Sequence, residues 1–157
     1  MTIRPGTRAD LPQALNLIKE LAVYEREPDA VETAVEDMIR DGFGERPVFE
    51  FFVAEEEDKI IGLALYFYSY STWKGRCLYL EDLIVTQSHR GKGVGRALFD
   101  KVLQKAREED VRRVVWQVLD WNTPAIDFYK SLGAAMLPEW VTCRLVHEQI
   151  QEYKPIE

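Results

Sequence analysis

A short loop rich in glycine and in cationic residues is the part of the sequence best suited to bind an anion. It runs from Arg90 to Arg96 with the sequence R-G-K-G-V-G-R, between an apolar stretch and an amphipathic one. The first backbone N–H groups of a helix have no acceptor inside the helix, and the helix dipole makes that end positive. Glycines let a ligand come close to the backbone, and the cationic side chains add charge. We therefore expect a phosphate or pyrophosphate group to bind where this loop opens a helix.

The loop does not match the two common nucleotide-binding patterns. No Gly-Lys-Ser or Gly-Lys-Thr follows at the P-loop distance, and Arg96 stands where the dinucleotide pattern G-x-G-x-x-G needs its third glycine. A flexible turn without a ligand is the alternative, although such turns rarely bring three cations onto a helix start.

Two adjacent acids, Glu81 and Asp82, interrupt the apolar strand expected over residues 78–85. Neighbouring strand residues point to opposite faces of a sheet. One of the two carboxylates therefore points to a face covered by other parts of the chain, unless the pleat is broken there. Because burial of an unpaired carboxylate is costly, two interpretations stay open. Either the strand has a bulge and one acid binds backbone N–H groups, or Glu81 contacts a cationic substrate and removes its proton through a water molecule.

The pattern of apolar and turn residues predicts alternating strands and helices around these groups. Thr7, with Asp10 three residues on, caps a helix to about Tyr24, and Thr33 is the expected cap of a second helix that stops at Gly42 or Gly44. The strands are expected over residues 2–4, 49–54, 60–70, 78–85, 111–119 and 140–147, and further helices run from the glycine loop to Glu108 and from Thr123 to Gly133.

These elements predict a mixed α/β sheet in a single domain over residues 1–157. The sheet is antiparallel at its start, and one parallel pair, residues 78–85 with 111–119, flanks the glycine loop. In the helix after Asn122, Tyr129 lies on the apolar face, so the residues alone indicate a core tyrosine with a satisfied hydroxyl. Asn122 or Thr123 caps this helix, and Pro124 suits its first turn.

Composition excludes several classes of protein. The formal net charge of -7 argues against general nucleic-acid binding and mildly favours small cationic partners. Cys77 and Cys143 have no metal-type spacing, and with only two histidines we expect no metal centre. The first residues lack the apolar core of a signal peptide, and no apolar run reaches membrane-spanning length. We expect a cytoplasmic protein that contacts neither a membrane nor nucleic acid.

The ordered set of motifs resembles the GNAT superfamily of acetyl-CoA-dependent N-acetyltransferases. R-G-K-G-V-G after an apolar strand looks like the R-x-x-G-x-G/A signature of that family, and the order of elements agrees over the whole chain. Motifs similar to the spermidine/spermine acetyltransferase branch are E-L-A-x-Y-E at Glu20 to Glu25, D-G-F-G at Asp41 to Gly44, Y-L-E-D at Tyr79 to Asp82, W-N at Trp121-Asn122 and F-Y-K at Phe128 to Lys130. S-T-W-K-G-R at Ser71 to Arg76 and L-D-W-N at Leu119 to Asn122 look closer to its thialysine acetyltransferase relatives.

The resemblance implies that acetyl-CoA is the cosubstrate. Backbone N–H groups of the loop would bind the pyrophosphate, main-chain groups of Leu83 and Val85 would contact the pantetheine arm and the acetyl carbonyl, and Tyr129 would be the general acid for the CoA thiolate. The implied cofactor-binding residues are Leu83, Ile84, Val85, Arg90, Gly91, Lys92, Gly93, Val94, Gly95, Arg96, Asn122, Pro124 and Tyr129. The implied fold is a mostly antiparallel sheet with a parallel pair splayed at the acetyl-CoA site and helices on both faces.

On the amine side, the resemblance gives Glu81 the role of substrate contact and proton relay, with Tyr129 as its catalytic partner. The implied substrate-binding residues are Tyr24, Glu25, Glu81, Asp82 and Glu139, and whether Glu81 or Asp82 relays the proton stays open. The chain departs from the family at His89, where an aromatic residue is expected, and at Arg96, where the polyamine enzymes tend to have serine.

The expected reaction is direct transfer of the acetyl group of acetyl-CoA to a primary amine of a small cationic substrate: a polyamine, a diamine or a thialysine-like amino acid. The alternatives are acetylation of protein lysines or N-termini and a non-catalytic acyl-CoA-binding module. The resemblance also implies a homodimer, with residues 63–70 at the interface. Lys74 and Arg76 could meet the 3′-phosphate of CoA or a second subunit.

Overall fold

The computed structural model describes residues 1–156, which fall into two compact units, Met1–Gln117 and the described residues from Val118 onward. The first unit contains the sheet, the glycine loop and both strand acids. Asn122, Tyr129 and Glu139 belong to the second unit. The prediction of a single domain over residues 1–157 stays a prediction.

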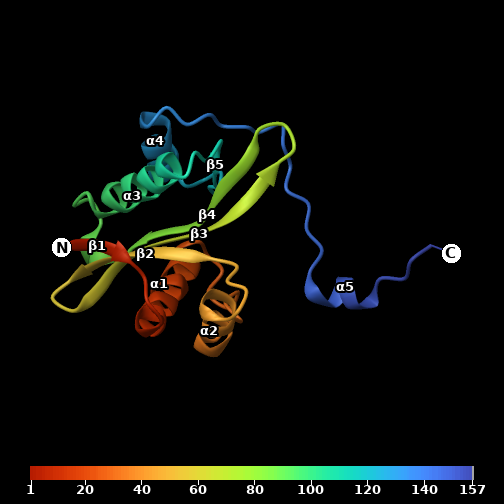
Figure 1. The fold of residues 1–157 in the computed structure, drawn as a ribbon, viewed down its shortest axis with the longest axis horizontal. Coiled ribbons are helices and arrows are strands. Elements are labelled where there is room, and N and C mark those ends of the chain that lie inside the picture. The colour runs from red at the N-terminus through yellow and green to blue at the C-terminus, as the bar shows by residue number, and fades with distance from the viewer. Residues whose placement is uncertain (157) are drawn as a thin grey trace. The chain divides into compact units, whose positions relative to one another are not determined.

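The first unit is built on a five-stranded sheet in the order β1-β2-β3-β4-β5 (Figure 1). The first four strands are antiparallel neighbours, and β4 and β5 are parallel. The strands are β1 (Thr2–Pro5), β2 (Glu50–Glu56), β3 (Lys59–Ser71), β4 (Gly75–Val85) and β5 (Val114–Val115). The predicted mixed and mostly antiparallel sheet is confirmed.

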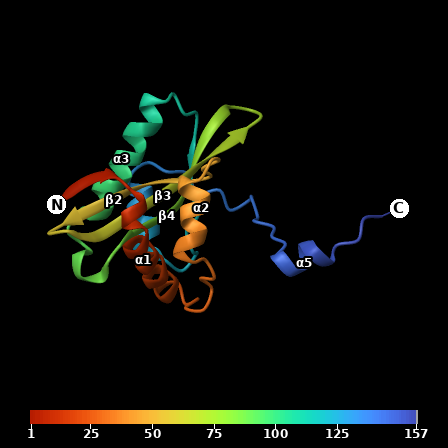
Figure 2. The same cartoon turned by 60° about the horizontal axis from the view of Figure 1, so that its bottom comes forward.

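Helices cover both faces of this sheet (Figures 1 and 2). On one face, α1 (Leu11–Tyr24) packs on β3 and β4, and α2 (Val35–Phe43) packs against α1. On the other face, α3 (Val94–Glu108) crosses β2, β3 and β4. No helix within residues 1–156 is both long and apolar enough to cross a lipid bilayer.

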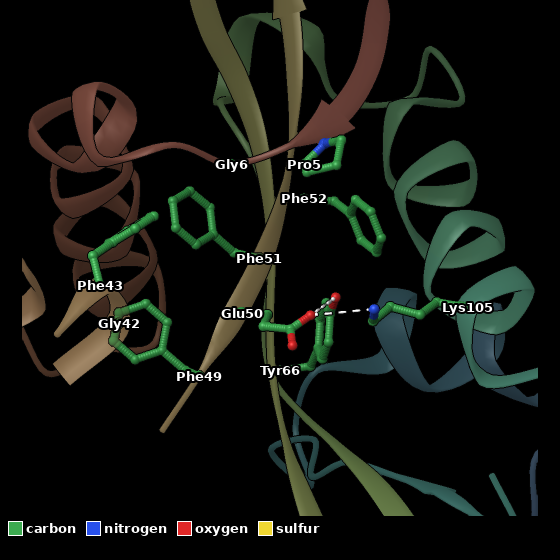
Figure 3. A pocket seen from close by; sticks show the side chains of 10 residues that line it. All are labelled: Pro5, Gly6, Gly42, Phe43, Phe49, Glu50, Phe51, Phe52, Tyr66 and Lys105. Atoms are coloured by element: carbon green, nitrogen blue, oxygen red, sulfur yellow. Dashed lines mark hydrogen bonds and ion pairs between the residues drawn. The ribbon is translucent and has the colours of Figure 1, made fainter. Parts of the chain in front are cut away.

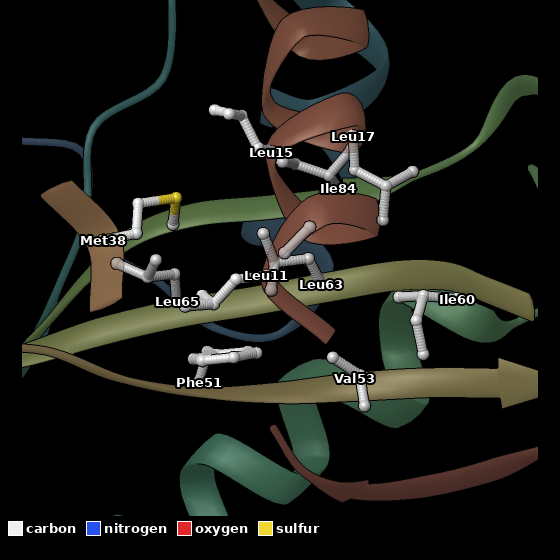
Figure 4. Close-up of a cluster of buried hydrophobic side chains, with 11 residues drawn as sticks. Leu11, Leu15, Leu17, Met38, Phe51, Val53, Ile60, Leu63, Leu65 and Ile84 are labelled. Atoms are coloured by element: carbon white, nitrogen blue, oxygen red, sulfur yellow. The ribbon is translucent and has the colours of Figure 1, made fainter. Parts of the chain in front are cut away.

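The core on the α1 face explains why β2 and β3 are almost continuously apolar (Figure 4). Both strands are covered on two sides, so residues of either parity are buried. On the opposite face, a Cβ at Gly62 would lie 2.8 Å from Leu98 Cδ1, so this glycine lets α3 come close to β3. The cluster on the α1 face is formed by Leu11, Ala14, Leu15, Leu17, Met38, Phe51, Val53, Ile60, Leu63, Leu65 and Ile84.

The start of α1 is held by a buried carboxylate, as the spacing of Thr7 and Asp10 predicts. Asp10 accepts hydrogen bonds from the backbone N–H and the hydroxyl of Thr7 at 2.7 and 2.8 Å. It also accepts from both terminal nitrogens of the Arg4 guanidinium, at 2.8 and 2.9 Å. The hydrogen bond from Arg4 is the main reason that the pKa of Asp10 is lowered to about 2. The predicted pairing of Thr7 with Asp10 is confirmed, and it caps the 3-10 turn Arg8–Asp10 that leads directly into α1.

Two predictions about the first unit are wrong in detail. The second helix begins after Ala34, whose N–H donates to the Asp37 carboxylate at 3.0 Å, so Asp37 and not Thr33 supplies the capping side chain. The strand predicted over residues 111–119 shortens to β5, because it has β4 partners only at Leu78 and Tyr79.

In the second unit, α4 (Thr123–Ser131) follows Asn122, whose side chain accepts from the Ala125 N–H at 3.4 Å. A short helix, α5 (His147–Glu152), comes later. The final strand predicted over residues 140–147 is wrong: residues 141–146 have neither helix nor strand assigned, and Trp140 and Val141 are exposed. A strand needs a neighbour for its backbone N–H and C=O groups, and among the described residues this segment has no such ladder.

Candidate functional site

The glycine loop has the geometry of an anion receptor. After β4, a single 3-10 turn at Gln87–His89 leads to Gly91 and Gly93, whose φ angles are 72° and 83°. This left-handed region favours glycine, and a Cβ at either position would meet no atom within 4 Å. The loop therefore needs glycine for its backbone conformation, and its surface is open.

The helix that follows begins without a side-chain cap. Gly93 is the N-cap of α3, and the first backbone hydrogen bond runs from the Ala97 N–H to the Gly93 C=O at 3.0 Å. The N–H groups of Val94, Gly95 and Arg96 come before this ladder. Together with the helix dipole, they can bind a phosphate oxygen.

The three cations of the loop differ in what they contact. Lys92 is exposed at the tip of the loop. Arg96 pairs with Asp100 one turn along α3, with Nε and Oδ1 2.8 Å apart. The guanidinium of Arg90 is turned toward α1 and the end of β4: its Nε donates to the Val85 C=O at 2.9 Å. Lys92 is thus the loop cation best placed to add charge for an anion.

At the edge of β4 next to the loop, main-chain groups are open for hydrogen bonds, apart from the Val85 C=O, which accepts from Arg90 Nε. The Thr86 N–H donates to the Ile61 C=O at 2.9 Å, so residue 86 faces β3. Because antiparallel strands alternate, Ile84 also faces β3, while Leu83 and Val85 direct their backbone groups away from it. The β4–β5 ladder covers only Leu78 and Tyr79, so β5 does not occupy this edge. The residues predicted to contact a pantetheine arm, Leu83 and Val85, are those that face outward.

A β-bulge separates the two strand acids from the regular ladder. Asp82 is opposite Leu65 and Leu80 is opposite Tyr66, which leaves Glu81 as the extra residue of β4. The bulge places Glu81 at the surface and Asp82 in a half-buried position. This break in the pleat explains how two adjacent acids fit into an otherwise apolar strand.

Asp82 lines a cavity of about 270 Å³ between α1, α2 and the sheet. Thr33 and Asp41 also line it, and the rest of its wall is apolar: Leu15, Ile18, Val31, Met38, Val48, Phe49 and Leu65. Burial of the carboxyl, reinforced by the charges of Glu81 and Glu25, raises the pKa of Asp82 to about 7. A carboxyl with this pKa exchanges a proton readily at physiological pH.

The C-terminal end of α1 lies beside this acidic site. Tyr24 is the last residue of the helix, and the Arg90 guanidinium carbon lies 4.9 Å from the centre of its ring. Glu25 follows, and burial raises the pKa of its carboxyl. The first unit therefore brings Tyr24, Glu25, Glu81 and Asp82 into one neighbourhood, in which Glu25 and Glu81 act electrostatically on Asp82.

The second unit holds the remaining predicted residues. Asn122 is the cap of α4, Pro124 lies in its first turn, and Tyr129 is buried, with its ring centre 5.4 Å from that of Phe128. Glu139 is exposed in a turn beyond α4. Capping by Asn122 is confirmed, and the catalytic and binding roles of these residues stay predictions.

Comparison with known proteins identifies the family to which this site belongs. The family described as Acetyltransferase (GNAT) family matches residues 12–134, which include the glycine loop, both strand acids and Tyr129. The chain belongs to the GNAT acetyltransferase family.

Relatives of this GNAT chain cover nearly its whole length. A thialysine N-epsilon-acetyltransferase of Bos taurus is 40% identical over 161 residues, which span 96% of this chain and 95% of the relative. A spermidine/spermine N(1)-acetyltransferase-like protein 1 of Homo sapiens is 36% identical over 158 residues, 94% of this chain and 23% of the relative. The recognised family and the enzyme class, N-acetyltransferase, are confirmed.

A solved structure shares the fold of this GNAT chain. An integron cassette protein from the mobile metagenome of V. cholerae has a TM-score of 0.79 to this chain at 26% sequence identity, and the match covers 96% of this chain and 95% of that one. The predicted fold class is therefore confirmed.

The sequence suggests two residues of the GNAT chain as contacts for the 3′-phosphate of CoA or for a second subunit. Both lie far from the glycine loop. Lys74 comes directly before β4 and Arg76 is its second residue, whereas the glycine loop follows the end of this strand, about ten residues or roughly 33 Å away. Arg76 pairs with Glu109 at 3.1 Å, and its guanidinium lies over the Tyr68 ring. This geometry does not support a phosphate role for either residue if the pyrophosphate binds at the loop.

Sequence reasoning missed Asp41 and Glu20 as members of the site. Asp41 was part of the D-G-F-G motif, and Glu20 was part of E-L-A-x-Y-E, but neither had a role. Glu20 lies one helical turn before Tyr24, so helical spacing indicated that the two side chains share a face. The Glu20 carboxylate accepts from the Gln87 N–H at 2.8 Å and from the Thr86 hydroxyl at 3.0 Å.

Proposed function

We propose that this GNAT enzyme transfers the acetyl group of acetyl-CoA directly to a primary amine of a small cationic molecule: a polyamine, a diamine or a thialysine-like amino acid. The observation that carries the proposal is on β4. Asp82, with its raised pKa and its acidic neighbours, is followed at once by Leu83, whose backbone groups face the open edge. The Asp82 carboxylate, which can accept a proton, is thus next in sequence to main-chain groups of Leu83 that can hydrogen-bond to an acyl carrier.

The cosubstrate side is supported by the open helix start and by the strand edge. The N–H groups of Val94, Gly95 and Arg96 and the exposed Lys92 suit a pyrophosphate, while Leu83 and Val85 suit an amide-containing arm. When bound, acetyl-CoA supplies a thioester, whose carbonyl carbon is open to attack by a neutral amine. The names of the relatives, which are acetyltransferases, agree with this assignment.

The residues that bind the amine must both attract its cationic form and remove a proton from it. An alkylamine with a pKa of about 10.4 lies roughly three units above neutral pH, so its neutral form costs about 4 to 5 kcal/mol. Transfer to an ordinary aspartate, with a pKa near 3.8, would be uphill by about 9 kcal/mol, whereas transfer to Asp82 at about 7 is uphill by about 5 kcal/mol. The raised pKa therefore removes about 4 kcal/mol from the proton-transfer step.

The roles of the acids follow from this difference. Glu81, at the surface of the bulge, and Glu25 bind the ammonium groups, and a second charged nitrogen of the substrate lets one acid anchor while another takes the proton. Either Glu81 or Asp82 relays the proton, and the raised pKa supports Asp82. The cavity, at about 270 Å³, is slightly smaller than the usual small-molecule site of about 300 to 1,000 Å³, which supports a small metabolite over a peptide chain.

Tyr129 is proposed as the general acid for the CoA thiolate, on its residue type and on the family resemblance. Proton transfer from a phenol with a pKa near 10 to a thiolate near 8.5 is uphill by only about 2 kcal/mol. Asn122 and Pro124 are proposed as further cosubstrate contacts, and Glu139 as a further amine contact.

The proposal is tested by incubating the purified protein with acetyl-CoA and a panel of amines and by following the release of free thiol. Spermidine, putrescine, thialysine and ornithine serve as free amines, and lysine-containing peptides serve as the matched comparison. Turnover of a free amine at a kcat/KM well above that of any peptide is expected. Preference for peptides indicates a protein acetyltransferase, and calorimetric binding of CoA without any turnover indicates a binding module; either result overturns the proposal.

A homodimer is also proposed, by the family resemblance, but the interface predicted over residues 63–70 needs revision. Residues 63–66 are buried in the core between the helices on both faces. The exposed part of this hairpin is its tip, where Tyr70 and Trp73 are each 76% exposed. A dimer contact by this hairpin therefore involves the tip, and sedimentation of the wild type against Trp73→Ser tests it.

A further inference from the structure

Residues 86–90, which lead into the glycine loop, are attached to α1 through one side chain. Glu20 accepts hydrogen bonds from the Gln87 N–H at 2.8 Å and from the Thr86 hydroxyl at 3.0 Å. A terminal nitrogen of Arg90 lies 3.7 Å from the same carboxylate. One acid of α1 thus contacts three residues of the segment before Gly91.

Arg90 also contacts Tyr24, next to the proposed amine-binding residue Glu25. Its Nε donates to the Val85 C=O at 2.9 Å, its terminal nitrogen faces Glu20, and its guanidinium carbon lies 4.9 Å from the centre of the Tyr24 ring. A guanidinium can do this because its nitrogens lie in a fixed plane, whereas an ammonium has a single charged centre. Arg90 therefore joins the end of β4 to the last turn of α1.

The other side of the segment is attached to β2. His89 Nε2 lies 3.1 Å from Glu56 Oε2, and His89 Nδ1 lies 2.9 Å from the Ser88 hydroxyl. Residues 86–90 are thus held from both sides, while Gly91 to Gly93 are exposed. The loop begins from a fixed support, so its open helix start is ready before a ligand arrives.

We infer that Glu20 and Arg90 are positioning residues, which hold the cosubstrate loop against the C-terminal turn of α1 and so couple the acetyl-CoA site to the Tyr24–Glu25 amine site. The inference rests on the proposed function, because it takes the loop as the cosubstrate site. It gives Arg90 a role different from the phosphate contact that its place in the glycine motif suggests.

The direction in which CoA affinity changes when Glu20 is removed tests this inference. A carboxylate close to an anion site repels the anion, so if Glu20 acted only through its charge, its removal would tighten CoA binding. If Glu20 holds the loop, its removal weakens CoA binding despite the lost repulsion. The two accounts predict changes in opposite directions.

Calorimetric titration of CoA into the wild type and single variants measures this sign. Glu20→Ala removes the charge and both hydrogen bonds, Glu20→Gln removes only the charge, and Thr86→Val removes one hydroxyl without a change in charge. We expect the dissociation constant to rise about five- to tenfold for Glu20→Ala, and about threefold for Thr86→Val, in line with the loss of charged and neutral hydrogen bonds. Lys19→Gln, an exposed neighbour on α1, is the control.

Arg90 is tested with a conservative variant and with kinetics. Arg90→Lys keeps the charge but not the planar contacts, so it should weaken CoA binding nearly as much as Arg90→Gln, and both should raise the KM for the amine more than they lower kcat. Glu20→Ala combined with Arg90→Gln should be little worse than the worse single variant, because both break the same attachment.

Tighter or unchanged CoA binding in Glu20→Ala, together with full rescue by Arg90→Lys, would make Arg90 a phosphate ligand and overturn the inference. Failure of the proposed function is a separate result. If the wild type binds CoA but acetylates no amine, the proposed reaction is lost, while the dissociation constants still decide the role of Glu20.

Discussion

Replacement of Asp82 by asparagine should lower activity and raise stability at the same time. Both effects follow from the raised pKa of this carboxyl, which moves from 3.8 to about 7 because the side chain is buried beside Glu81 and Glu25. An amide of the same shape cannot take a proton from the substrate, so turnover should fall about 10²- to 10⁴-fold, the range for loss of general base catalysis. Glu81→Gln, measured in parallel, shows which acid is the relay.

The size of the stability effect depends on pH. Between about pH 4 and pH 7 the folded state keeps a proton on Asp82 that the unfolded state releases, so the wild type loses stability as pH rises through this window. The pKa of Asp82 differs by about three between the folded and unfolded states. At about 1.36 kcal/mol for each pH unit, the loss of stability has an upper limit of about 4 kcal/mol. Asp82→Asn removes this cost, so its advantage over the wild type should be small near pH 4, grow toward pH 7 and stay constant above it.

Urea unfolding at pH 4.5 and pH 8 measures the stability difference, and initial rates from pH 6 to pH 9 measure activity. In the wild type, kcat/KM should rise with a pKa near 7, and this limb should be absent in Asp82→Asn. Asp29→Asn, in the exposed α1–α2 connection, controls for loss of one negative charge. Turnover within twofold of the wild type, or a stability difference that does not change with pH, would show that Asp82 is not the poised acid described above.

The remaining predictions concern three other positions. Tyr129→Phe should keep CoA affinity by calorimetry while turnover falls ~10²-fold or more, and unchanged turnover would reduce Tyr129 to a packing role. Gly93→Ala should cost roughly 1 to 2 kcal/mol in urea unfolding and weaken CoA binding, because φ is 83° there; equal stability would mean that the loop can change its path. Asp10→Asn should lose about 2 kcal/mol at pH 7, since the pKa of Asp10 is about 2 in the folded state, against its ordinary value of 3.8. Because a lowered pKa stabilises the fold above about pH 4, this loss should shrink as pH falls toward 2, and a loss of the same size at both pH values would contradict the assignment.

Short-range patterns predicted the parts of the fold that depend on local chemistry. The glycine loop, the pairing of Thr7 with Asp10 at the 3-10 turn before α1 and the capping of α4 by Asn122 need only neighbours within a few residues. The break in the strand at Glu81 could also be anticipated, because two adjacent acids cannot both leave an apolar strand without a change in the pleat.

The features that were missed depend on contacts between distant segments. The motif around Arg90 gives no sign of its ion pair with Glu20, because Glu20 lies 70 positions earlier on another element. The raised pKa of Asp82 depends on burial by α1 and α2, which no local pattern reports. The strand predicted at residues 140–147 has a suitable apolar pattern, but a strand is set by its neighbour, and a pattern does not supply one.

A second cavity of about 160 Å³ shows why burial alone does not make a catalytic group (Figure 3). There Lys105 lies 3.3 Å from Glu50, and the Tyr66 hydroxyl donates to the same carboxylate at 2.9 Å. These polar groups satisfy one another, so the charges of the cavity are already neutralised. Asp82 differs because its charged neighbours, Glu25 and Glu81, are of its own sign.

The edge of β4 at Leu83 and at the Val85 N–H, which lies beyond the β5 ladder, has a practical consequence for anyone who handles this enzyme. Unpaired strand edges are templates on which other chains add strands, and this is a common start of aggregation. A cosubstrate that bonds to that edge would protect it, and binding to the native state alone also raises the melting temperature. Storage with CoA, followed by light scattering on warming, should therefore yield a longer-lived preparation than storage in buffer.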